Sequence, residues 1–327
     1  MTDRTPMRAI SRRATLVAAL AMPAVARAQG DVWPSRPVRF IVPYAPGGGT
    51  DVTTRLIAEG MTNKFGKQFV VENRAGANGI VGTQVVSRAE PDGYTFGAQT
   101  STHIMARRLG PLPYDPVTDF TPISLMARYP LVMMASARAP FTDIAGLIAE
   151  AKKQPGGMAQ GTSDAQSSFA ARQFARAAGI EINEVPYRGS GAYLADLSAG
   201  HLPVAWGSPA TAAPMAASGQ VKLIGVSSPE RSPFLPNVPT ITESGVTGAD
   251  FIGWFGLFGP ARLPRPIAVA LNTAINEYIV TPAMQARYAT LANEFSPMDL
   301  DQLMALMRAD DERWARAQAE GLIERQP

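Results

Sequence analysis

The chain has 327 residues, of which 46% are hydrophobic and 17% are charged, and its formal net charge is +3. This length exceeds what one ordinary hydrophobic core covers, so we expect two lobes. The sequence holds no cysteine, which excludes disulfides, thiolate metal sites and a cysteine nucleophile. The two histidines, His103 and His201, are too few to favour a histidine metal cluster, and no apolar run reaches the ~20 residues of a membrane-spanning helix.

Residues 1–28 have the pattern of an export signal. Arginines precede an apolar run at 14–22, and Ala26 and Ala28 supply a small-residue cleavage site. The run 11–16 also fits a twin-arginine signal, so that route and the general export route both stay open. Five of the 30 basic residues and one of the 27 acidic residues lie in this segment, which leaves the rest of the chain with a charge of −1. No basic face remains for nucleic acid.

From residue 38 onward, short apolar runs alternate with turns rich in Gly, Pro, Ser and Thr and with helical stretches. This alternation predicts an α/β fold with mostly parallel sheets and crossover helices. In the first lobe we expect strands at 38–42, 69–72 and 95–98, with helices at about 51–65 and 80–89. Thr50 or Asp51 is placed to cap the first of these helices.

A long strand at 125–136 is expected to cross into the second lobe. That lobe should contain helices at 144–153 and up to 179, a segment 184–191 followed by a helix, and strands at 204–209 and 223–227. A strand at 251–258 returns to the first lobe, and two terminal helices at about 266–280 and 299–321 pack there. We therefore predict a first lobe of 29–128 with 252–327, and a second lobe of 129–251.

The strand-to-helix junctions carry Gly, Ser and Thr and few charges. In a parallel sheet these junctions lie at the carboxyl ends of the strands, where ligands bind. Free backbone N–H groups at helix starts favour an anion, and hydroxyl groups add adjustable donors. The pattern predicts a small anion held between the strand-to-helix junctions of the two lobes.

The segment 43–51 is the sharpest motif, because three successive glycines let backbone amides approach a ligand closely. An ordinary βα turn with a capping Asp51 is the alternative interpretation. The spacing matches neither a Walker phosphate loop, which needs a lysine, nor the G-x-G-x-x-G dinucleotide pattern.

Catalytic patterns are weak. The sequence lacks the G-x-S-x-G nucleophile motif. His103 is the one histidine at a junction, and it fits either a general base or a polar rim residue, whereas His201 is typical of a surface turn. Arg188 follows a strand and fits either a carboxylate contact or a solvated side chain. Four aromatic residues fit either the binding site or the core: Tyr44, Tyr187, Trp206 and Trp254.

Several stretches together resemble one family. They include VRFIVPYAPGGGTD at 38–51, VENRAGANGIVG at 71–82 and EPDGY at 90–94. Further matches lie at 33–34, 114–116, 119–123, 185–189, 196–197, 231–240, 243, 245 and 254–260. The chain resembles the Bug family, the extracytoplasmic substrate-binding proteins of tripartite tricarboxylate transporters. That resemblance implies a two-lobed type II periplasmic-binding fold with crossing hinge strands, a small carboxylate ligand, and membrane transporter subunits as partners. It also implies a periplasmic protein that is no enzyme and needs no cofactor or metal; we expect a monomer without a lipid anchor.

The predicted ligand contacts combine the junction pattern with the loops that match the family. They are Tyr44, Pro46, Gly47, Gly48, Thr50, Asp51, Ser101, Thr102, His103, Thr162, Ser163, Ser167, Arg188, Gly189 and Ser208. One departure stands out, because Asp164 and Gln166 lie where the family usually has a Gly-rich stretch with Ser, Thr and His, so ligand identity does not carry over. Two alternatives stay open: a sensory module that presents its ligand to a membrane receptor, and a periplasmic enzyme that uses His103 or Ser163.

Overall fold

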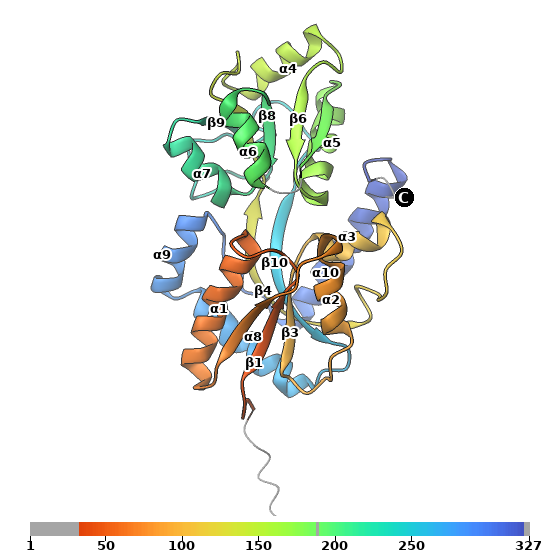
Figure 1. The fold of residues 1–327 in the computed structure, drawn as a ribbon, viewed down its shortest axis with the longest axis vertical. Helices are drawn as coiled ribbons and strands as arrows, with labels where there is room; N and C mark the ends of the chain where they lie inside the picture. The colour runs from red at the N-terminus through yellow and green to blue at the C-terminus, as the bar shows by residue number, and fades with distance from the viewer. Residues whose placement is uncertain (1–32, 188–189, 324–327) are drawn as a thin grey trace, which may run out of the picture. The chain divides into compact units, whose positions relative to one another are not determined.

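A computed structural model describes residues 33–187 and 190–323 (Figure 1). A compact unit begins at Pro34. The predicted export signal at 1–28, and Arg188 and Gly189, lie outside the described residues. Within the described ranges, each helix is too short or too polar to span a bilayer.

The first sheet is built from the N-terminal strands and one late strand. Its order is β2-β1-β3-β10-β4, from Phe69–Asn73, Val38–Val42, Thr95–Thr100, Ile252–Pro260 and Phe120–Pro130. Strand β1 pairs in parallel with β2 and β3, whereas β10 is antiparallel to both β3 and β4. Phe40 of β1 is fully buried and meets Phe69 and Phe96 edge-on, at ring-centroid distances of 5.3 and 6.0 Å. These neighbouring strands therefore share one aromatic core.

The helices around this sheet begin and end at recognisable signals. Helix α1 stops at Gly66, whose φ of 66° suits glycine and whose N–H bonds to the Thr62 carbonyl. Helix α9 begins with the Thr281 cap followed by Pro282, and α10 begins with a capping box between Asp299 and Gln302. The set is α1 Gly49–Phe65, η1 Ala77–Gly79, α2 Ile80–Ser87, α3 Thr102–Leu109, α8 Arg265–Ile279, α9 Pro282–Leu291 and α10 Leu300–Ala319.

The second sheet has the order β7-β6-β8-β5-β9, from Asn183–Pro186, Ala159–Thr162, Val204–Gly207, Val132–Ser136 and Val221–Val226. Its strand β6 is parallel to β7 and β8, and β5 is antiparallel to β8 and β9. Tyr193, Leu197 and Met134 belong to a buried cluster on this sheet. The accompanying helices are α4 Ile144–Lys153, α5 Ala165–Ala178, α6 Ser190–Ala199 and α7 Pro209–Ala217.

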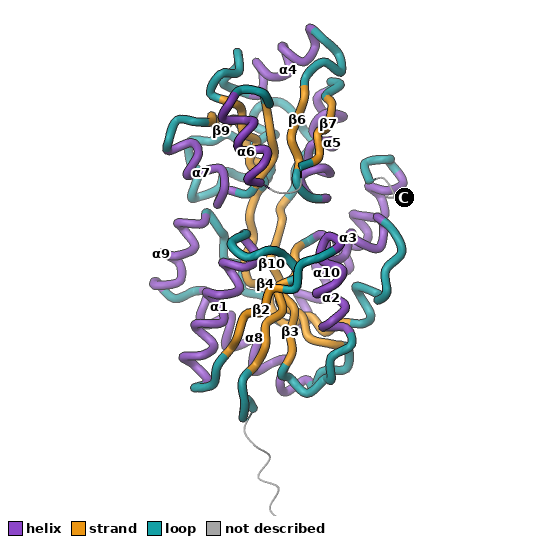
Figure 2. Tube along the Cα trace, in the orientation of Figure 1, coloured by secondary structure: helices purple, strands orange, loops and turns teal. Residues whose placement is uncertain are grey.

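Two strands connect the sheets (Figure 2). Strand β4 ends at Pro130, and after Leu131 the chain enters the second sheet as β5, so the predicted strand 125–136 is divided into two. Strand β10 begins at Ile252, which pairs with Pro130. Ser227 ties the crossing together, because its hydroxyl accepts from the Leu131 N–H at 2.8 Å and donates to the Phe251 carbonyl at 2.6 Å.

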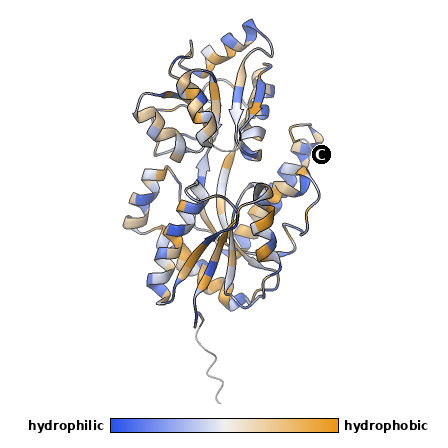
Figure 3. Cartoon of the chain, in the orientation of Figure 1, coloured by the Kyte–Doolittle hydropathy of each residue, from blue (hydrophilic) through white to orange (hydrophobic). Residues whose placement is uncertain are grey.

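The sequence-based elements are largely reproduced, with several differences. The sheets are mixed rather than mostly parallel, because the connecting strands β4 and β10 form an antiparallel pair and β5 runs against its neighbours. Helix α9 was not predicted, and no bounds were predicted for α3, α7 or β6. Neither Thr50 nor Asp51 caps α1, since its N-cap is Gly48 without a side-chain cap. Figure 3 shows hydrophobic residues along the strands and hydrophilic patches on the helices, as expected for helices that cover a sheet.

Candidate functional site

Three hydroxyl groups meet where β1 and β3 end. The Tyr44 hydroxyl lies 3.2 Å from Thr100 Oγ1 and 3.4 Å from Thr102 Oγ1, and the two threonine oxygens are 2.6 Å apart. We call Tyr44, Thr100 and Thr102 the hydroxyl cluster. Burial raises the pKa of Tyr44 more than its threonine hydrogen bonds lower it, so the phenol stays neutral at physiological pH. The cluster is an uncharged group of rotatable donors and acceptors.

Ser101 stands beside this cluster as the N-cap of α3. It is only 1% exposed, and within the described part of the chain its hydroxyl has no hydrogen-bond partner. Buried hydroxyls are normally bonded, and an unbonded one costs free energy. A ligand atom at the start of α3 would satisfy it, and the first amides of that helix also lack intrahelical partners.

The glycine loop before α1 is exposed at Pro46, Gly47 and Gly48. Gly47 adopts a φ of +84°, and its N–H donates to Asp51 Oδ2 at 2.9 Å. A side chain at Gly49 would come within 2.9 Å of the Phe255 ring, so the loop lies close against β10. The residue types allow main-chain amides to face a ligand.

Asp51 holds this loop in place. It is 3% exposed, accepts from Asn73 Nδ2 at 2.9 Å, and pairs with Arg55 at 3.0 Å. Burial would raise its pKa, but the hydrogen bonds from Arg55, Gly47 and Asn73 outweigh burial and hold the pKa below its usual range. Its carboxylate is thus occupied by protein groups. Thr50 is also buried, and its carbonyl accepts from Thr54 Oγ1.

His103 lies in the core. It is 3% exposed, and its ring contacts three aromatic rings, those of Tyr114, Phe120 and Phe258. Burial lowers its pKa to about 4, so the ring is neutral at pH 7. Nε2 lies 2.9 Å from the Pro116 carbonyl, which can only accept, so Nε2 carries the proton; Nδ1 has no hydrogen-bond partner among the described residues. This environment suits packing rather than proton transfer to a ligand.

The junction after β6 is built differently. Asp164 is the N-cap of α5, and its Oδ1 accepts from the Ser167 N–H at 2.8 Å. The Ser167 hydroxyl in turn accepts from the N–H groups of Ser163 and Asp164, at 3.0 and 3.1 Å. Thr162 is 2% exposed and donates to Glu184 at 2.8 Å. Most polar groups of this turn are consumed by the helix start and its neighbours.

Ser208 and the β7 loop complete the second sheet's junctions. Ser208 is the N-cap of α7, and its hydroxyl lies 3.4 Å from Thr211 Oγ1 without capping the helix. Arg188 and Gly189 lie outside the described residues, so their predicted ligand contacts stay predictions. The structure thus places Tyr44 and Thr102 in one cluster with Ser101 adjacent in sequence, and turns Asp51, His103, Thr162 and Ser167 toward protein partners.

Tyr129 of β4, in the first sheet, contacts α5, which accompanies the second sheet. Its hydroxyl donates to Gln166 Oε1 of α5 at 3.0 Å, and its ring stacks on Phe255 at 4.5 Å. Burial raises the pKa of Tyr44, Tyr129 and Tyr193, and the negative charge of Asp164 raises each further. These three tyrosines, from β4, α6 and the end of β1, therefore lie within the electrostatic reach of Asp164.

Sequence reasoning missed Thr100, Tyr129 and Tyr193. Thr100 was within reach, because it ends β3 one residue before Ser101. Tyr129 and Tyr193 carry no motif, since one lies in a crossing strand and the other in the apolar cluster of the second sheet.

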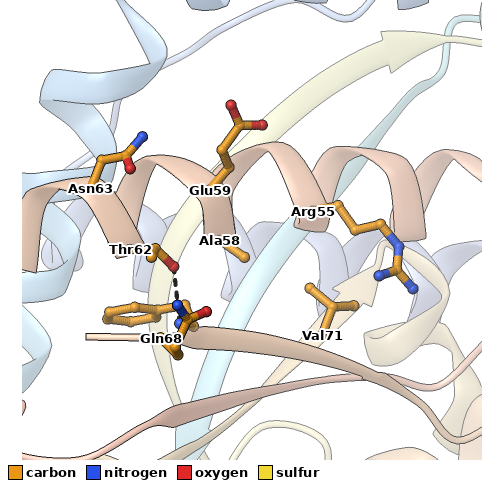
Figure 4. Close-up of a pocket in the computed structure, with 8 residues that line it drawn as sticks. Arg55, Ala58, Glu59, Thr62, Asn63, Gln68 and Val71 are labelled. Carbon is orange, nitrogen blue, oxygen red and sulfur yellow. Dashed lines mark hydrogen bonds between the residues drawn. The ribbon is translucent and has the colours of Figure 1, made fainter. Parts of the chain in front are cut away.

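A depression of about 350 Å³ lies between α1 and β2, away from the hydroxyl cluster (Figure 4). Its charged lining residues are Arg55, paired with Asp51, and Glu59, paired with Arg287. The Phe69 N–H donates to Thr62 Oγ1 across its floor. Its lining includes no member of the hydroxyl cluster, and in the described ranges no group of three or more His, Asp or Glu side chains is arranged to hold a metal.

Comparison with known proteins identifies the family of this chain. The sequence profile described as "Tripartite tricarboxylate transporter family receptor" (TctC) matches residues 53–322. The chain belongs to the TctC family. It is 31% identical to protein BugT of Bordetella pertussis over 87% of this chain and 89% of that protein.

Two solved structures extend the TctC likeness to the fold. The R. palustris protein Rpa4515, solved with adipate, has a TM-score of 0.83 at 31% identity, over 89% of this chain and 98% of that one. MatC from Rhodopseudomonas palustris, solved with bound malate, has a TM-score of 0.79 at 29% identity, over 88% and 100%. The predicted family and the α/β periplasmic-binding fold class are confirmed, and the similar solved structures include one described as periplasmic binding protein BugD and one described as a TctC solute binding protein.

Proposed function

We propose that this TctC-family chain is an exported periplasmic receptor that captures a small carboxylate and delivers it to the membrane subunits of a tripartite tricarboxylate transporter. It catalyses no reaction and uses no cofactor in this role. Support comes from the family and from two relatives whose structures hold the dicarboxylates adipate and malate. The observation that carries the proposal is the buried, unbonded Ser101 hydroxyl beside the hydroxyl cluster.

The chemistry of this region suits a carboxylate. Tyr44 is neutral, and hydroxyls can turn their protons toward an anion. The starts of α1 and α3 present amides without intrahelical partners, and the helix dipole favours negative charge there. A carboxylate could accept from Ser101, Thr102 and the exposed amides around Gly48.

The proposed contacts fall into two groups. Those that meet the ligand are Tyr44, Pro46, Gly47, Gly48, Ser101, Thr102, Ser163 and Ser208, with Arg188 and Gly189. Those that shape the loops are Thr50, Asp51, His103, Thr162 and Ser167, because their polar groups bond to protein partners or lie in the core.

Capture proceeds by closure of two lobes, 29–128 with 252–327 and 129–251. Strands β4 and β10 connect them, and hinges of this kind absorb their rotation at a few residues. The ligand favours the closed form because only there do both lobes contact it. Within the described residues, the Tyr129–Gln166 hydrogen bond is a contact that closure could make or break.

Export is part of the proposal. Residues 1–28 would be removed on secretion, leaving Gln29 as the first residue of a monomer, and the sequence offers no cysteine for lipid attachment. Mass spectrometry of the secreted protein tests the cleavage point, and blocking one export route at a time distinguishes the twin-arginine route from the general one.

Thermal unfolding of the purified protein against a carboxylate panel tests capture. The panel contains aliphatic, hydroxy, aromatic and amino acids, with matched alcohols as controls. A ligand at ~100 times its dissociation constant adds about 2.7 kcal/mol, which raises the midpoint by several degrees. Ser218→Ala, which removes an exposed hydroxyl that donates to the Met215 carbonyl, should keep the shift. A panel in which no carboxylate moves the midpoint would contradict the proposal.

A further inference from the structure

The first turn of α5 presents a carboxylate that protein groups only half use. Asp164 is exposed, and its Oδ1 accepts from the Ser167 N–H. Within residues 33–187 and 190–323, its Oδ2 has no hydrogen bond and the side chain joins no ion pair. Arg172, further along α5, is already paired with Glu184 at 2.8 Å. A full negative charge therefore remains at this junction.

This charge lies near the proposed ligand site. Gln166, two residues along, accepts from Tyr129 of β4, and Gly253 of β10 packs so closely that a Cβ there would lie 2.8 Å from Gln166 Oε1. The start of α5 is thus held against the connecting strands. The charge of Asp164 is also felt by Tyr44, a member of the hydroxyl cluster, and by Tyr193 of α6.

The hydroxyl cluster and the start of α5 consequently favour ligand groups of opposite charge. The hydroxyl cluster and the helix starts beside it suit an anion. At α5 the capping Asp164 already accepts from an N-terminal amide and adds a negative charge, so that helix start repels a second carboxylate. A ligand with a positive group at one end and a carboxylate at the other matches both sides.

We propose that Asp164 makes this receptor selective for carboxylates that also carry a protonated amine, with the ammonium on the Asp164 carboxylate and the ligand carboxylate on the Ser101–Thr102 side. This inference rests on the proposed function, since it assigns the ligand class of the same site. An ammonium that pairs with Oδ2 leaves the helix cap through Oδ1 intact, so binding costs no secondary structure.

Titration calorimetry on the purified protein with matched ligand pairs tests the inference. The pairs are succinate with aspartate, glutarate with glutamate, adipate with 2-aminoadipate, and butanoate with 4-aminobutanoate. At least one amino member should bind tenfold or more tighter than its plain partner. Asp164→Asn keeps a capping residue but removes the charge, and should reduce that preference at least tenfold.

Asp143→Asn is the matched control. Asp143 caps α4 in the same way, with Oδ1 accepting from the Gly146 N–H at 2.7 Å, so this variant changes charge and cap equally at another helix. Its preference ratio should equal that of the wild type. A fall in the ratio for both variants would assign the effect to net charge and overturn the role of Asp164.

The remaining outcomes separate the two proposals. If plain acids bind as tightly as their amino partners, and Asp164→Asn leaves the ratio unchanged, the inference is overturned while carboxylate capture stands. If Asp164→Asn strengthens plain acids but no amine helps the wild type, Asp164 only excludes charge and the inference again fails. If no carboxylate binds either protein, capture itself is wrong.

Discussion

The junctions after β3 and after β6 use the same residue types for different purposes. Beside β3, the Ser101 hydroxyl is buried and has no partner in the part of the chain that the structure describes, next to three hydroxyls that bond to one another. After β6, Ser167 and Asp164 bond to each other and to the first turn of α5. The comparison teaches that a Ser or Thr at a strand-to-helix junction is available to a ligand when its hydroxyl is not bonded to the backbone of the helix start.

The largest expected effect is a loss of stability in acid that comes from His103, which lies just after β3. The folded-state pKa of His103 is about 4, below its usual 6.5, because burial disfavours the charged ring. Between these values the unfolded chain binds the extra proton, so stability present above pH 6.5 is lost as the pH falls toward 4. The loss from this residue reaches about 3 kcal/mol. Urea unfolding at pH 7, 5.5 and 4 measures it.

Two variants isolate that contribution from the carboxylates, such as Asp51 and Glu184, whose lowered pKa values also cost stability in acid. His103→Gln should show a smaller loss between pH 7 and 4 than the wild type. His201→Gln, which changes an exposed histidine, should retain the wild-type loss. Equal losses in all three proteins would show that His103 does not titrate as its burial requires.

The second effect tests the packing of Gly253 against Tyr129 of β4 and Gln166 of α5. In Gly253→Ala, the new methyl group would lie 2.7 Å from Tyr129 Cζ and 2.8 Å from Gln166 Oε1. We expect the free energy of unfolding to fall by about 2 kcal/mol, as for other overpacked sites. Gly191→Ala on α6, where nothing lies within 4 Å, should leave stability unchanged or slightly higher. A Gly253→Ala protein as stable as Gly191→Ala would mean that Tyr129 and Gln166 separate readily.

The sequence predicted most elements because their signals are local. The strand 38–42 and the helix 144–153 appear at the expected bounds, since apolar runs and the Asp143 cap mark them. Helix α9 was missed because Pro282 reads as a break, although it occupies the first helical position. The division of 125–136 at Leu131 was missed because the stretch is mostly apolar on both sides of that residue, and the split depends on pairing with β10 and β8.

Side-chain roles at the site were harder to predict. Asp51 and His103 stand at the right junctions, but whether they face a ligand depends on Asn73 and Pro116, which lie 22 and 13 residues away in sequence. Tyr44 and Thr102 were predicted and lie together, because a parallel arrangement brings the ends of β1 and β3 to one edge. Local pattern finds the junction, whereas tertiary contacts decide which polar atoms remain available.

The third effect sets the two junction serines against each other. Ser101→Ala removes an unbonded hydroxyl, so unliganded stability should change by less than about 0.5 kcal/mol while carboxylate affinity falls about tenfold, or ~1.4 kcal/mol. Ser167→Ala removes bonded groups, so stability should fall by about 1 kcal/mol with little change in affinity. Urea unfolding and titration calorimetry on both variants measure the two quantities. The prediction is contradicted if Ser101→Ala lowers stability and Ser167→Ala lowers affinity instead.

The smallest effect separates the cap from the charge at Asp164. Asparagine caps a helix about as well as aspartate, so Asp164→Asn should keep the free energy of unfolding within about 0.5 kcal/mol of the wild type. Asp164→Ala loses the bond from Oδ1 to the Ser167 N–H and should cost about 1 kcal/mol. Urea unfolding without ligand resolves the difference. If Asn costs as much as Ala, the charge itself stabilises α5 through the helix dipole, and Asp164 is then a structural residue whose negative charge needs no ligand to explain it.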